Sequence, residues 1–218
     1  MVGRLDQARI NRIPRLNKLL SSAILVACAL LIWTTAAVGT ALARTAALLC
    51  AGMAFSLLGD VIMAQLLPLR QYVLCGMGAF GLTQVLYILG YLRLGQALGL
   101  SDSTVRLACL AGAYVIGISL WWRLVFSSRQ RTAMNVASLG YCLLLLTMAG
   151  LATSVAVQEP HLTILAVGGC LFVLSDLLLG HRLFRMRRFL LMGDLVWMTY
   201  ISGQALIVYS AAVASRLL

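Results

Sequence analysis

Two aspartates lie inside apolar segments that are long enough to cross a membrane. Asp60 falls in FSLLGDVIM (55–63), and Asp176 falls in FVLSDLLL (172–179). A charged carboxylate at the centre of a bilayer costs roughly 2.5–3.5 kcal/mol on insertion scales, so such residues usually mark functional sites. Two carboxyls that share a site can divide the work of protonating a substrate, stabilising a cation and activating water. The alternative is that each Asp only hydrogen-bonds to Ser, Tyr or backbone of a neighbouring helix.

Further polar side chains in the apolar segments are candidates for substrate binding. Tyr200 and Gln204 are four residues apart and share one face of a helix. Tyr141 is a plausible wall residue. We expect the substrate-binding residues to be Tyr200, Gln204, Tyr87, Gln84, Ser56 and Asn135.

A third acid, Asp194, opens the last apolar segment beside a basic loop. Because acids are favoured at helix N-termini, we expect Asp194 to cap that helix or to pair with Arg187 or Arg188. We therefore do not place it in the catalytic pair.

The composition predicts an all-α transmembrane bundle. Of 218 residues, 62% are hydrophobic and 11% are charged, and the mean hydropathy is +0.98. Uncharged stretches of about 20 residues are typical of membrane-spanning helices, and the alternation typical of β-barrels is absent. The predicted spans are about 19–39, 45–67, 71–92, 104–122, 132–152, 161–180 and 190–214. Residues 1–18 form a basic segment, and 19–218 form one transmembrane domain whose first helix we expect to be retained rather than cleaved.

The basic residues predict the orientation of the bundle. Positively charged loops stay on the cytoplasmic side. With the N-terminus inside and the C-terminus outside, 13 of the 17 Lys and Arg residues are cytoplasmic, and the outer segments hold only Arg44, Arg93, Arg106 and Arg216. The net charge of +11 therefore reflects membrane topology, and we expect no nucleic-acid partner. We expect a multi-pass protein of a bacterial inner (plasma) membrane.

The cysteines, histidines and glycines indicate packing rather than chemistry. The six cysteines lie in apolar stretches without a CxxC pair, and the two histidines form no ligand cluster. We therefore expect no disulfide framework, no metal and no cofactor. Glycines in the spans are expected to allow close helix contacts; they are Gly52, Gly59, Gly76, Gly78, Gly81, Gly168 and Gly169. The second and third spans also resemble the sixth and seventh, which could mark an internal repeat.

The order and spacing of three short motifs resemble those of a known family. FSLLGD (55–60), FVLSD (172–176), and Tyr200 followed by QALI (204–207) are similar to the YhhN family of integral membrane proteins, which includes the lysoplasmalogenases. The similarity runs from about residue 18 to residue 209. Members commonly have a further N-terminal span, a Lys-Pro-Leu step where this chain has Lys18-Leu19-Leu20, and His in place of Gln84. Because glutamine cannot titrate, proton transfer is not expected at that position.

The resemblance implies hydrolysis of the vinyl-ether bond of a lysoplasmalogen to a fatty aldehyde and a glycerophospho-base. Asp60 and Asp176 would be the catalytic residues, with either one as the acid. The partners would be a single-chain ether lysophospholipid and the surrounding membrane lipids. A different class of function, a proton- or cation-coupled transporter, could use the same aspartates. The prolines lie only near the ends of the spans, whereas transporters often have broken helices near the midplane, and this difference favours the enzyme.

Overall fold

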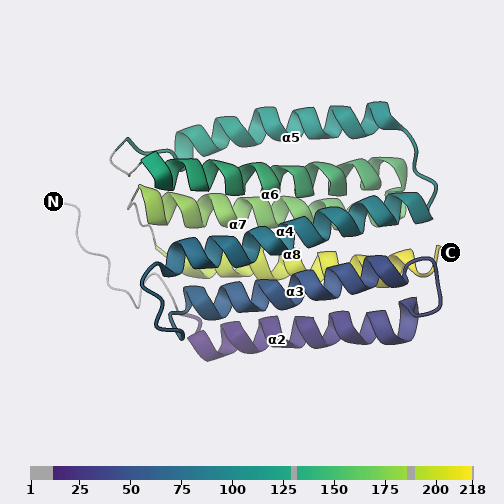
Figure 1. Ribbon diagram of the computed structural model, residues 1–218, viewed down its shortest axis with the longest axis horizontal. Helices are drawn as coiled ribbons and strands as arrows, with labels where there is room; N and C mark the ends of the chain where they lie inside the picture. Colours follow the sequence, from purple (N-terminus) through teal and green to yellow (C-terminus); the bar gives the residue numbers. More distant parts are fainter. Residues whose placement is uncertain (1–11, 129–131, 186–189, 218) are drawn as a thin grey trace.

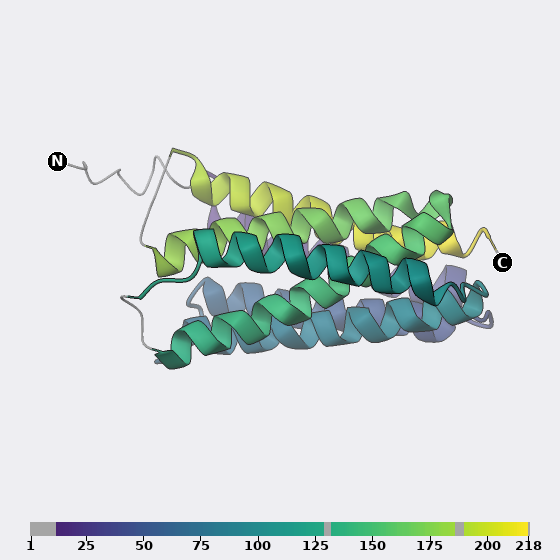
Figure 2. The same ribbon diagram turned by 90° about the horizontal axis from the view of Figure 1, so that it is seen from above.

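Seven long helices form one elongated bundle in the computed structural model, which describes residues 12–128, 132–185 and 190–217 (Figures 1 and 2). Each is long and apolar enough to cross a membrane, which confirms the all-α, seven-span prediction. The helices are α2 (Arg15–Ile32, continued by a π-helical turn, Trp33–Ala37), α3 (Ala43–Met63), α4 (Tyr72–Ala97), α5 (Ser103–Leu124), α6 (Thr132–Gln158), α7 (Thr163–Phe184, after the 3-10 turn Pro160–Leu162) and α8 (Met192–Ala214).

The helices differ in how much of their surface they bury. In Figure 1, α2 and α5 lie at opposite edges of the bundle, and α4 and α8 cross its middle. The edge helices bury few side chains, and their outward faces carry exposed aliphatic residues such as Ile24 and Ile116. The central core contains fully buried large residues, among them Tyr87, Met148, Phe172 and Ile207. A bundle of this kind leaves its apolar edge helices to contact lipid.

Glycines lie at the closest contacts between helices. This agrees with the prediction for most of the seven glycines named from the sequence. A methyl group at Gly52 would lie 2.4 Å from the Tyr87 ring, and one at Gly59 would lie 2.8 Å from the Phe80 ring. One at Gly168 would meet the backbone oxygen of Gly203 at 2.9 Å, so α7 and α8 touch through their backbones. Gly78 is the exception, because a methyl group there would meet nothing within 4 Å.

The C-terminus of α3 has a non-glycine residue in the left-handed conformation. Gln65 has φ of 57°, and the N–H groups of Gln65 and Leu66 donate to the carbonyls of Ile62 and Val61. These two bonds define a Schellman motif, in which glycine is the usual residue at this position.

We expect Gln65→Gly to stabilise the protein. The left-handed conformation costs a residue with a Cβ roughly 1–2 kcal/mol, and the greater freedom of glycine in the unfolded chain offsets about 0.5–1 kcal/mol of that gain. Thermal unfolding of purified protein in detergent should therefore show a modest rise in Tm for Gln65→Gly. Gln65→Ala is the matched control and should leave the Tm unchanged. A lower Tm for the glycine variant than for the alanine variant would contradict the conformational explanation.

Candidate active site

A cavity of about 540 Å³ lies at the end of the bundle where α2, α4, α6 and α8 begin and α3 and α7 end. Asp60 of α3 and Asp176 of α7 both line it. The two aspartates singled out in the sequence, 116 positions apart in the chain, therefore face one space. Both aspartates lie in the C-terminal halves of their helices, and α3 and α7, as the second and sixth spans, run in the same direction.

Asp60 is held by hydroxyl groups from two other helices. Its Oδ2 accepts hydrogen bonds from Ser22 Oγ of α2 at 2.6 Å and from Tyr200 OH of α8 at 2.8 Å. The Tyr200 ring is fixed in turn by edge contacts with Phe80 and Phe172, whose ring centroids lie 6.0 and 5.6 Å away. Asp60 is only 9% exposed, so its carboxyl orientation is set by protein groups rather than by solvent.

A chain of buried polar groups continues from Tyr200 into the core. Ser56 Oγ lies 2.8 Å from Tyr200 OH, and the Gln204 amide donates to Ser56 Oγ at 2.5 Å. Tyr87 OH completes the chain by donating to Gln204 Oε1 at 2.7 Å. Four of the predicted substrate-binding residues thus form one network behind Asp60. Of these four, Tyr200 lines the cavity, whereas Ser56, Gln204 and Tyr87 do not.

Asp176 has a different environment. Its Oδ2 accepts a hydrogen bond from Tyr141 OH of α6. It also lines a second, smaller cavity of about 60 Å³, whose walls are mainly apolar and include Met77, Trp121 and Leu145. Asp60 does not line that space. Asp176 therefore stands between a polar cavity and an apolar slot.

Two predicted residues lie outside this arrangement. Gln84 is fully buried beside Tyr141, but neither of its amide atoms has a well-formed hydrogen bond within the described part of the chain. Asn135 donates to the carbonyl of Ser127 at 2.9 Å and so fastens the connection between α5 and α6. Neither residue lines either cavity, because Gln84 lies deeper in α4 and Asn135 faces the loop.

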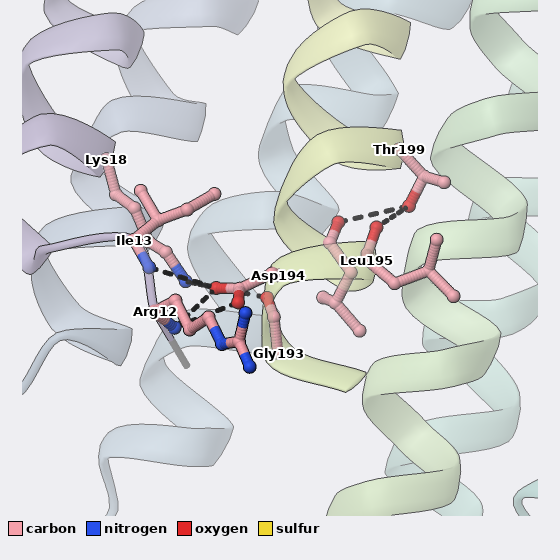
Figure 3. Close-up of polar contacts among 8 residues, drawn as sticks. Arg12, Ile13, Lys18, Gly193, Asp194, Leu195 and Thr199 are labelled. Atoms are coloured by element: carbon pink, nitrogen blue, oxygen red, sulfur yellow. Dashed lines mark hydrogen bonds and ion pairs between the residues drawn. The ribbon is translucent and has the colours of Figure 1, made fainter. Parts of the chain in front are cut away.

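The third acid does not cap α8. The N-cap residue is Leu191, and Asp194 lies in the first turn of the helix. Its carboxylate accepts backbone hydrogen bonds from Arg12 at 2.8 Å and Ile13 at 3.1 Å, and it lies 4.0 Å from Lys18 Nζ (Figure 3). Asp194 thus binds the segment before α2 to the start of α8. The predicted partners Arg187 and Arg188 lie outside the described residues.

Several residues of the site were not singled out from the sequence. Ser22 supplies a hydrogen bond to Asp60, but a lone serine in an apolar helix has no distinguishing pattern. Trp197 lines the cavity one helical turn from Gly193, and its ring lies 5.1 Å from that of Tyr200. The basic residues that line the cavity are Arg15, Lys18 and Arg182. The sequence had indicated only that these side chains lie at membrane boundaries.

Side chains of the types that ligate metals are dispersed over the described part of the chain. Among the described residues, no three His, Cys, Asp or Glu side chains come together in a way that could hold a metal ion.

These features define a polytopic α-helical membrane protein with a cavity in which two intramembrane carboxyl groups converge. The chain belongs to the YhhN family, whose pattern matches residues 16–211. That family includes lysoplasmalogenases. Among curated proteins and among solved structures, none matches the chain.

Proposed function

We propose that the protein hydrolyses the vinyl-ether bond of lysoplasmalogens, with Asp60 and Asp176 as the catalytic residues. The observation that carries the proposal is that both carboxyls face one cavity, beside an apolar slot suited to the start of an alkyl chain. Membership of the YhhN family supports the same activity. The substrate is a single-chain lipid that would reach the cavity from the surrounding leaflet.

The reaction needs one proton donor and one group that stabilises a cation. A proton adds to the vinyl carbon farther from the ether oxygen, which leaves an oxocarbenium ion at the nearer carbon. Water attacks that carbon and loses a proton, and the resulting hemiacetal collapses to a fatty aldehyde and the free glycerol hydroxyl. One water is consumed for each bond cleaved, and the proton taken from the enzyme is returned. Two carboxyls can perform both proton transfers.

The geometry favours Asp176 as the proton donor. The carbon that accepts the proton belongs to the alkyl-chain side of the vinyl ether, and Asp176 borders the apolar slot. The carbon that water attacks lies on the glycerol side. Asp60, which lines the larger cavity and not the slot, would stabilise the cation and orient water there. Tyr200 and Ser22 would hold the Asp60 carboxyl in position for that role.

The unbroken helices around the cavity favour an enzyme over a transporter. In many secondary transporters the substrate site is formed by broken helices near the midplane. Here α3, α4, α7 and α8 each run as one α-helix, and the cavity lies toward one end of the bundle.

The direct test is aldehyde release by purified protein in detergent from three lysolipids of equal chain length. A vinyl-ether lipid should be cleaved, whereas the saturated alkyl-ether analogue should not, because it cannot form the cation by protonation at carbon. The ester analogue should release no aldehyde and little fatty acid. Cleavage of none of the three would overturn the proposal, and equal release of the chain from ester and vinyl ether would point to a different hydrolase.

Reaction in deuterated water tests the proposed first step. We expect the aldehyde, trapped by reduction as it forms, to carry one deuterium on the carbon next to the carbonyl, because that carbon receives the solvent-derived proton. Mass spectrometry of the trapped alcohol measures the label, and authentic aldehyde incubated with the protein under the same conditions corrects for exchange. An unlabelled product would exclude protonation at the vinyl carbon.

A further inference from the structure

Three basic side chains line the same cavity as the two aspartates. Arg15 and Lys18 lie in the first turns of α2, and Arg182 lies in the last turn of α7. Arg15 is exposed, and the other two are partly exposed, which places them at the outer rim of the cavity. The cavity thus has a basic rim, a pair of carboxyls below it and an apolar slot beside Asp176. We call Arg15, Lys18 and Arg182 the basic rim.

Lys18 of α2 and Arg182 of α7 come from different helices and line the same cavity. Lys18 is partly compensated by Asp194, 4.0 Å away, but that carboxylate also accepts two backbone hydrogen bonds from Arg12 and one from Ile13. Three basic side chains at one mouth raise the local positive potential, which favours the binding of an anion there.

The axial spacing between the basic rim and the carboxyls is compatible with the length of a glycerophosphate. Arg182 is six residues beyond Asp176 on α7, and Lys18 is four residues before Ser22, which bonds to Asp60. At 1.5 Å per residue these separations are about 9 and about 6 Å along the helices. In a glycerophospholipid, five bonds of about 1.5 Å separate the first glycerol oxygen from phosphorus, an extended span of about 6 Å.

We infer that the basic rim binds the phosphate group of a single-chain phospholipid and thereby sets the depth to which the ligand enters the cavity. Arginine and lysine are the usual ligands of phosphodiester oxygens, and hydrogen bonds between charged groups are the stronger ones. The inference rests on the proposed function for the identity of the bond that is cleaved. It adds a requirement for a phosphate group in the ligand, and it predicts that glycerol ethers without phosphate are poor substrates.

Equilibrium binding separates this inference from catalysis. The probes are lysophosphatidylcholine, which has no vinyl ether, and a 1-monoacylglycerol of the same chain length, which has no phosphate. We expect Arg182→Gln to weaken binding of lysophosphatidylcholine about tenfold or more, because a charge-assisted contact is lost. Binding of the monoacylglycerol should change less than about twofold by the same reasoning. Arg15→Gln should act in the same direction, and Arg182→Lys should restore most of the affinity.

Arg216→Gln is the matched control, because Arg216 is exposed beyond the far end of α8. It should alter neither affinity. Thermal unfolding of each variant checks that the bundle is intact. An unchanged affinity of Arg182→Gln for lysophosphatidylcholine, or an equal loss for both lipids, would overturn the inference.

The two proposals can fail separately. Selective loss of phospholipid binding without any aldehyde release from a lysoplasmalogen would support the basic rim and reject the hydrolase. Aldehyde release with equal rates for a lysoplasmalogen and a neutral vinyl-ether glycerol would support the hydrolase and reject the basic rim.

Discussion

Asp60→Asn and Asp176→Asn are each expected to lower kcat/KM for a lysoplasmalogen by about 10²–10⁴-fold, the usual contribution of a general acid or base. Asparagine has nearly the same shape, so both cavities should keep their walls. At position 60 its amide oxygen can still accept hydrogen bonds from Ser22 and Tyr200. An amide cannot deliver a proton to carbon, and it stabilises an oxocarbenium ion far less than a carboxylate does. The loss should therefore appear mainly in kcat.

The kcat/KM of the double variant should be only slightly lower than that of the less active single variant. Catalytic groups that act on one transition state are strongly non-additive. Full multiplication of the two losses would instead indicate that the two aspartates act in independent steps. Aldehyde release under single-turnover conditions provides the measurement.

Asp102→Asn is the matched control for both substitutions. Asp102 is the N-cap of α5, where its carboxylate accepts from the N–H groups of Thr104 and Val105 at 2.9 and 3.1 Å. Asparagine caps helices about as well as aspartate does. This change should therefore leave activity and Tm near those of the parent. Parent-like activity of Asp60→Asn or Asp176→Asn would remove that residue from the proposed mechanism.

The sequence predicted the fold well because the signals for membrane helices are strong and local. A stretch of about 20 apolar residues without charge has few alternatives to a spanning helix. Boundaries were less certain: the fifth predicted span ended near residue 152, whereas α6 continues to Gln158. Residues 153–158 are polar enough to suggest a loop, but they still satisfy their backbone groups best by continuing the helix.

The sequence reveals some residues of the site but not others. Asp60 and Asp176 stood out because isolated acids in apolar helices are costly, and the structure brings both to one cavity. Their partners depend on how the helices rotate and pack, which a single sequence does not specify. Ser22 therefore went unnoticed, and Asn135, which looked equally suitable, fastens a loop instead.

The orientation of Asp194 shows a further limit of local reasoning. An acid at the start of a helix suggests capping, and the position near the N-terminus of α8 was predicted correctly. However, its hydrogen-bond donors come from Arg12 and Ile13, more than 180 residues earlier in the chain. Such long-range contacts follow from the bundle as a whole. Short-range rules about helix ends cannot foresee them.

Gly203→Ala is expected to destabilise the protein more than any other small substitution considered. A methyl group at Gly203 would lie 2.8 Å from the backbone oxygen of Gly168 and 3.1 Å from the backbone nitrogen of Phe172. These are backbone atoms of α7, so no side chain can rotate away, and α7 and α8 must separate. Tyr200 and Gln204 lie on either side of Gly203 in α8. Their hydrogen bonds to Asp60 and Ser56 would lengthen with the shift.

The expected cost is about 1–3 kcal/mol, as for other insertions of a methyl group into a close-packed interior. It should appear as a clear fall in Tm in detergent, accompanied by a loss of aldehyde release larger than the unfolded fraction explains. Gly140→Ala is the matched control, because Gly140 lies within α6 and a methyl group there would meet nothing within 4 Å. Alanine favours a helix over glycine by about 1 kcal/mol, so this control should equal or exceed the parent in Tm. If Gly203→Ala behaved like the control, the backbone contact between α7 and α8 could not be what positions Tyr200 against Asp60.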